Sequence, residues 1–165
     1  MSARRAGLAL AIVHVLLVGT LGLKLLADRA RLPRAWARTL PFDPNLPIRG
    51  RYVRLRLEVP LAVGSDSARA GEYRRVRLQA AGDRLEGVLE DEGPLRVRLD
   101  ATADGLVAGL DDAVAFFIPE HIPDPSVRPM GEELWAEVTI PRRGPPRPIR
   151  LAVRRDGTLT PLEIR

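Results

Sequence analysis

The chain has few of the residues that most often carry chemistry. Its 165 residues include no cysteine, two histidines and a single lysine, Lys24. The absence of cysteine excludes a disulfide framework, a thiolate metal site and a cysteine nucleophile. Only four serines occur, and none stands in a Gly-x-Ser-x-Gly turn or at a spacing from histidine or lysine that is typical of an activated nucleophile. We therefore expect no catalytic residue, no cofactor and no metal.

Aromatic residues and an excess of charge of one sign are also scarce. Aromatics make up 4% of the chain, and 26 basic residues face 21 acidic ones, a net charge of +5. Nucleic-acid-binding proteins gather their cations on one face and interleave them with aromatic residues for base stacking. Here the arginines alternate with apolar residues and are mixed with Asp and Glu. The pattern indicates that the protein does not bind nucleic acid.

One long apolar run stands near the N-terminus. Residues 6–23 carry no charge, and the run extends to residue 27 if the Lys24 ammonium reaches the lipid headgroups. About 20 helical residues cross the hydrocarbon core of a bilayer. The run is longer than the apolar part of most signal peptides, and no Ala-x-Ala cleavage pattern follows it. The sequence therefore predicts a retained transmembrane anchor over residues 6–27, after a short tail at 1–5.

Arginines flank this anchor on both sides. Arg4 and Arg5 favour a cytoplasmic N-terminus, whereas the segment 28–39, expected as a juxtamembrane link, carries four more arginines. Long domains cross the membrane largely regardless of such charges. We expect a single-pass membrane protein whose residues 40–165 are exported from the cytoplasm.

Residues 40–165 change to a period of two, which is typical of half-buried strands. In residues 52–59, for example, Val53, Leu55, Leu57 and Val59 share one face. The same alternation recurs at about 75–80, 85–90, 95–99, 134–140 and 149–154, and Asp156-Gly157 predicts a tight hairpin into 159–164. The fold class predicted is mainly β, an antiparallel β-sandwich or partly open barrel preceded by one transmembrane helix.

Two local motifs interrupt the regular strands, and together they resemble the GDYXXLXY family. The first contains Asp43-Pro44 and then Arg49-Gly50-Arg51-Tyr52-Val53 with Leu55, and the second contains Phe117, Pro119, Glu120 and His121. The resemblance implies a bacterial membrane-anchored exported domain of unestablished activity, often encoded beside multi-pass membrane proteins. It also implies a location in the inner membrane, with the domain facing the periplasm or the cell exterior. Three positions depart from the family pattern: Arg51 replaces its Asp, Leu57 its final Tyr and His121 a usual Gly. The arginine in place of the aspartate favours a structural or partner-binding motif over a catalytic one.

These observations lead to one expected function and one alternative. We expect a non-enzymatic domain that binds a membrane-protein partner or an envelope component, with the bilayer contacting residues 6–27. The alternative is a membrane-surface hydrolase or small-ligand-binding protein that uses the segments 49–52 and 117–121. We also expect the two motifs to meet in space, at one rim of the domain. The candidate binding or structural residues are Asp43, Pro44, Arg49, Gly50, Arg51, Tyr52, Val53, Leu55, Phe117, Pro119, Glu120 and His121.

Overall fold

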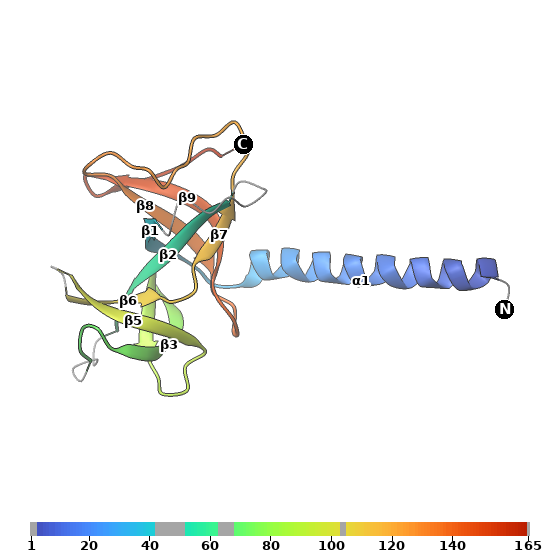
Figure 1. The fold of residues 1–165 in the computed structure, drawn as a ribbon, viewed down its shortest axis with the longest axis horizontal. Coiled ribbons are helices and arrows are strands. Elements are labelled where there is room, and N and C mark those ends of the chain that lie inside the picture. The colour runs from blue at the N-terminus through green and yellow to red at the C-terminus, as the bar shows by residue number, and fades with distance from the viewer. Residues whose placement is uncertain (1–2, 42–51, 63–67, 103–104, 165) are drawn as a thin grey trace. The chain divides into compact units, whose positions relative to one another are not determined.

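The computed structural model describes residues 3–41, 52–62, 68–102 and 105–164. The chain divides into two compact units, residues 1–32 and residues 33–165. The first unit is helical and the second consists of strands and turns (Figure 1).

The first unit is the helix α1 (Ala3–Arg31). Its segment Arg5–Arg31 is long and apolar enough to cross a membrane. Two polar side chains in it contact carbonyls of the helix itself: the Thr20 hydroxyl donates to the Leu16 carbonyl at 2.8 Å, and His14 Nδ1 lies 2.9 Å from the Leu10 carbonyl oxygen. The Thr20 hydroxyl and one ring nitrogen of His14 therefore have partners within the helix, which suits an apolar environment.

Six strands of the second unit close into a barrel. The ring runs β1–β4–β3–β5–β6–β2 and returns to β1. Every pairing in it is antiparallel except β1–β4, which pairs in parallel at Trp36 and Arg84. Of the two architectures that the sequence left open, the structure has the barrel. The six strands are β1 (Arg34–Pro41), β2 (Tyr52–Pro60), β3 (Tyr73–Ala81), β4 (Arg84–Leu89), β5 (Leu95–Thr102) and β6 (Gly105–Leu110).

Four further strands extend the barrel at two places. β8 (Glu133–Thr139) pairs with the free edge of β1, and β9 (Arg147–Arg155) and β10 (Thr158–Pro161) follow it outward. β7 (Val114–Phe117) pairs with the first half of β2, beyond the residues that pair with β6. In Figure 1, β8 and β9 lie in the upper part of this unit and β3, β5 and β6 in the lower part, with β2 running diagonally between them.

The buried faces of the strands β1 to β9 share one apolar core. The alternation expected for residues 52–59 is confirmed, since Val53, Leu55, Leu57 and Val59 are buried and their neighbours are not. Leu134, Ala136, Val138 and Leu151 of the β8–β9 pair belong to the same cluster. The expected hairpin at Asp156-Gly157 is also present, and both residues have the positive φ that a two-residue turn of this kind requires.

The structure differs from the sequence-based expectations in two segments. The segment 28–39, expected as a link, contains the last turn of α1 and most of β1, so the chain enters the barrel only two residues after the helix ends. Residues 105–110 form β6, although their sequence, Gly-Leu-Val-Ala-Gly-Leu, does not alternate. Both strands have partners along two edges, and such strands are buried by their neighbours whatever their own pattern.

Candidate functional site

The two sequence motifs meet where β2 pairs with β7. Tyr52 lies opposite Phe117 in the antiparallel register, and their ring centroids are 5.7 Å apart in an edge-to-face arrangement. Both rings are exposed, Tyr52 by 52% and Phe117 by 61%. Val53 and Leu55, by contrast, belong to the core. The expectation that the motifs come together is thus confirmed for Tyr52 and Phe117, and the pairing of two strands accounts for their contact.

The remaining motif residues form no pocket with this pair among the described residues. Pro119, Glu120 and His121 lie in a turn closed by a hydrogen bond from the Ile122 N–H to the Pro119 carbonyl. Glu120 and His121 are exposed. Asp43, Pro44, Arg49, Gly50 and Arg51 lie outside the described residues. For these five residues the expected meeting of the two motifs therefore stays a prediction.

A different face of the domain gathers its aromatic and charged side chains. Along β1, β8 and β9 the residues opposite the core form cross-strand rows, because the side chains of paired residues lie on the same face. Trp36 pairs with Glu137 and Arg38 with Trp135, and Glu137 pairs in turn with Arg150. Both tryptophans of the chain are therefore on this face.

The cleft beside this face has a volume of about 680 Å³, within the range of ligand-binding pockets. It lies between the β1–β8–β9 face and the barrel elements β2, β4, β5 and β6. Its polar lining comprises three arginines and two glutamates, a formal charge of +1. The residues that line it are Trp36, Ala37, Arg38, Glu58, Pro60, Leu61, Ala62, Ala68, Arg84, Leu85, Thr102, Leu106, Val107, Glu133, Trp135 and Arg154.

Both cleft carboxylates are held by one guanidinium. Arg38 Nη1 lies 3.4 Å from Glu58 Oε2, and Arg38 Nε lies 3.2 Å from Glu133 Oε1. The other oxygen of Glu133 accepts a hydrogen bond of 3.0 Å from the Trp135 indole N–H. Because the two carboxylates are engaged with the same arginine, they add little attraction for a cationic ligand.

The other two cleft arginines lie beside an indole. The guanidinium carbons of Arg84 and Arg154 are 5.9 Å and 5.2 Å from the ring centroid of Trp135. In the part of the chain that the structure describes, no carboxylate pairs with either of them. A guanidinium over an aromatic ring keeps its N–H donors free for a carboxylate or a phosphate. The cleft therefore offers donors for an anionic group next to apolar lining from Leu61, Leu85 and Leu106.

Sequence reasoning did not identify this cleft, although one signal pointed to it. In the alternating run 133–140 the bulky Trp135 stands at an outward position among Glu133, Glu137 and Thr139, where a solvent-facing strand normally carries small or polar residues. Arg84 comes from β4 on the barrel side of the cleft, whereas Arg154 comes from β9 on the same side as Trp135, and 70 positions separate the two arginines in the chain. No spacing rule relates them, because the closure of the barrel brings β4 next to β1.

Other constellations of reactive groups do not assemble among the described residues. Within the ranges 3–41, 52–62, 68–102 and 105–164, no three His, Asp or Glu side chains gather as metal ligands would. The backbone N–H of Ser126 donates to Asp124 Oδ1 at 2.8 Å, which closes a local turn. The cleft is therefore the strongest candidate for a ligand site in this part of the molecule.

Comparison of the chain with known protein families, with curated proteins and with solved structures found no match.

Proposed function

We propose that this protein is a single-pass inner-membrane protein whose exported β-barrel domain acts by binding, and that the cleft beside Trp135 holds an anionic group of an envelope component or of a membrane-protein partner. The observation that carries the proposal is the pair Arg84 and Arg154, two guanidiniums beside one indole in an open cleft. The helix Arg5–Arg31 supports the anchoring. The resemblance of residues 41–57 and 117–120 to the GDYXXLXY motifs supports the exported location.

The chemistry of the cleft favours an anion over a neutral sugar. A sugar ring binds tryptophan by stacking on its face, but guanidiniums already lie near the Trp135 ring, and its side chain is largely buried. A ligand in the cleft therefore finds N–H donors beside the indole. Carboxylate and phosphate groups are the acceptors that match these donors in a bidentate geometry.

The arrangement also favours binding over catalysis. A general acid or base must be within hydrogen-bond reach of the reacting group. The two cleft carboxylates, Glu58 and Glu133, instead contact Arg38. The Thr102 hydroxyl, which also lines the cleft, donates to the Gly105 carbonyl at 2.9 Å. These polar groups of the cleft are committed to contacts within the protein.

The test is photo-crosslinking in cells that produce the full chain. A photoreactive amino acid replaces Val107, which lines the cleft, and in a second strain it replaces Thr158, an exposed residue of β10 that does not. We expect a crosslinked species at position 107 that is absent at position 158. Its mass distinguishes an envelope component from a membrane-protein partner.

The matched variants decide whether the arginines are responsible. The double variant Arg84→Gln/Arg154→Gln should remove most of the crosslinked species at position 107, because each charged hydrogen bond contributes about 1.5–3 kcal/mol. The control Arg96→Gln/Arg98→Gln removes the same charge from the outer surface of β5 and should leave the crosslink unchanged. A crosslink that survives the first pair, or that falls equally with both, would contradict the proposal.

A further inference from the structure

The hairpin between β8 and β9 carries an unusual concentration of positive charge. Its sequence from 141 to 147 is Pro-Arg-Arg-Gly-Pro-Pro-Arg, and no Asp or Glu occurs between Val138 and Arg155. Arg142 and Arg143 are exposed, and neither contacts a carboxylate of the described residues. Elsewhere on the domain most exposed arginines of the strands have an acidic neighbour, as Arg77 has Glu90 and Arg96 has Asp111.

The register of the strands places this hairpin at the end of the domain where the chain enters. β8 runs antiparallel to β1, so its last residues pair with the first residues of β1: Thr139 lies opposite Arg34. One step further, the Ile140 N–H donates to the Pro33 carbonyl at 2.9 Å. Residues 141–146 therefore extend beyond the first residue of β1.

Chain connectivity relates this end of the domain to the bilayer. Only Leu32 and Pro33 separate the end of α1 from β1, and this linker spans about 11 Å when fully extended. That length is comparable to the Debye length at physiological ionic strength, about 8 Å. If α1 crosses the membrane, the hairpin therefore starts within range of the negative potential of anionic headgroups.

We infer that Arg142 and Arg143 dock the β8–β9 hairpin on anionic lipid headgroups of the membrane that α1 spans. This inference rests on the anchoring part of the proposed function and adds a second contact with the same bilayer. Guanidiniums bind phosphate oxygens through several N–H donors, and Gly144, with φ of +83°, turns the chain so that two adjacent arginines stand at the tip. Docking restricts how the domain, and with it the cleft, is presented above the membrane surface.

The absence of cysteine makes the test direct. Pro145→Cys places a single thiol at the hairpin tip, and Thr158→Cys places one at the other end of β9, about 26 Å away along a nine-residue strand. Each full-length variant is labelled with the same fluorophore and reconstituted in phosphatidylcholine vesicles with or without phosphatidylglycerol. A trace lipid with a nitroxide headgroup quenches labels at the surface.

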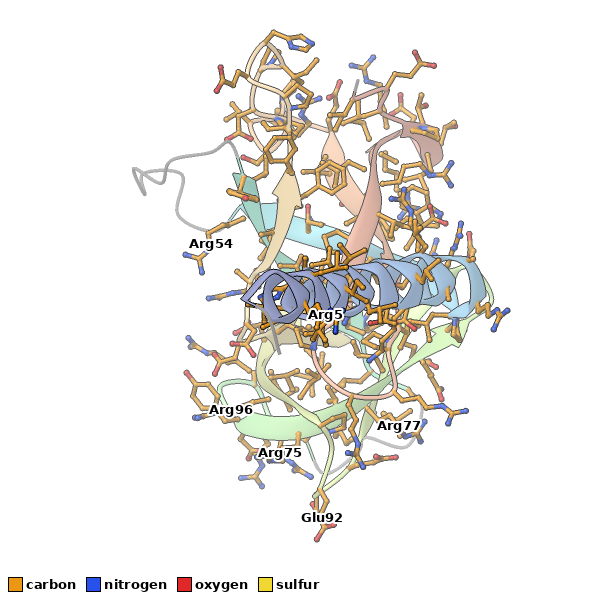
Figure 2. The ribbon with its side chains drawn as sticks, turned by 90° about the vertical axis from the view of Figure 1, so that its right-hand side faces the viewer. Arg5, Arg54, Arg75, Arg77, Glu92 and Arg96 are labelled. Carbon is orange, nitrogen blue, oxygen red and sulfur yellow. The ribbon has the colours of Figure 1, made fainter. Side chains whose placement is uncertain are left out.

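We expect strong quenching of the label at position 145 in vesicles that contain phosphatidylglycerol, and much weaker quenching without it or at position 158. When Arg142→Gln/Arg143→Gln is added to the Pro145→Cys variant, the ratio of docked to undocked domains should fall about 30-fold, since each arginine near an anionic surface contributes about a factor of five. The control Arg96→Gln/Arg98→Gln changes the net charge equally on the outer surface of the barrel, where Figure 2 shows Arg96, and should leave the quenching unchanged.

Flotation of the same vesicles separates the two possible failures. If the chain does not float with the vesicles after an alkaline wash, the anchoring fails, and the docking inference falls with it. If the chain floats but quenching at position 145 is independent of phosphatidylglycerol, or survives Arg142→Gln/Arg143→Gln, the docking inference alone is overturned. Equal quenching at positions 145 and 158 overturns it as well.

Discussion

Two ion pairs of this domain have matching geometry and different burial. Their comparison tests how much the burial of a carboxylate adds to the stabilisation by an ion pair. Arg150 places Nε and Nη2 on one oxygen of Glu137, at 2.9 Å and 2.8 Å. Arg77 places the same two atoms on one oxygen of Glu90, both at 2.7 Å. The arginine side chains are almost equally exposed, 52% and 51%, but the Glu137 side chain is only 10% exposed whereas that of Glu90 is 37% exposed. The pairs differ in the burial of the carboxylate and in the Trp36 ring, whose centroid lies 5.5 Å from the Arg150 guanidinium.

Arg150→Met is expected to lower the free energy of unfolding by about 2–3 kcal/mol. Breaking a fully buried pair costs about 3–5 kcal/mol because the remaining charge is left without a partner. The expected loss of unfolding free energy is smaller here, because Arg150 is half exposed and water can occupy the space that the guanidinium leaves beside Glu137. The figure includes about 0.5–1 kcal/mol for the guanidinium that lies 5.5 Å from the Trp36 ring. Arg77→Met, on the outer surface of the barrel (Figure 2), should cost about 0–1 kcal/mol.

The measurement is thermal unfolding of the full-length protein in detergent, followed by the far-ultraviolet circular dichroism of the strands. For a domain of this size Arg150→Met should lower the melting temperature by about 6–12 °C and Arg77→Met by less than about 4 °C. Tryptophan fluorescence is unsuitable because Trp36 lies beside Arg150.

A double variant checks the physical reason. In Glu137→Leu/Arg150→Met no buried carboxylate is left without a partner, so the double variant should be more stable than Arg150→Met alone. Equal destabilisation by Arg150→Met and Arg77→Met, or a double variant less stable than Arg150→Met, would refute the argument that burial of the carboxylate sets the value of the pair.

Two further predictions concern the barrel and the orientation of the chain. In Gly93→Ala the new Cβ would lie 2.7 Å from the Val76 backbone nitrogen, so we expect a loss of about 1–3 kcal/mol in the same melting experiment. Gly87→Ala, whose Cβ would have its nearest neighbours at 3.6 Å, is the control, and equal losses would contradict the prediction. A reporter enzyme that is active only outside the cytoplasm should be active when it is fused after Arg165, because Arg4 and Arg5 favour a cytoplasmic N-terminus. If this reporter is inactive and a reporter that is active only in the cytoplasm is active at the same position, the orientation is the reverse.

The cleft and the hairpin suggest a common arrangement for the domain. The cleft brings together Trp36, Arg84 and Trp135 from three strands, and Trp36 lies two residues beyond the first residue of β1. Docking of Arg142 and Arg143 on headgroups would limit the tilt, relative to the bilayer, of β1 and of the β8–β9 pair that is hydrogen-bonded to its edge. The proposed anionic ligand would then be held at a restricted height above the bilayer.

The sequence by itself determined the features that depend on local periodicity and length. An uncharged run of 18 residues predicts an apolar helix because helical length and hydrocarbon thickness match, and the structure has such a helix. Alternation predicts the strand at 52–60 with its buried face, since successive side chains of a strand point to opposite sides. The Asp156-Gly157 turn follows from the positive φ that these residues tolerate.

Only the tertiary structure decided which strands meet and what their outer faces form. β1 carries no strong alternation of its own, yet it pairs with β2, β4 and β8 and so closes the barrel. Its parallel contact with β4 sets Arg84 next to Trp135, although 51 positions separate them in the chain. Strand order is chosen by the burial of all the apolar faces in one core, a property of the whole chain that no local pattern contains. The cleft is a consequence of that choice, and for this reason the motif residues predicted that the two motifs meet but not the place of the candidate site.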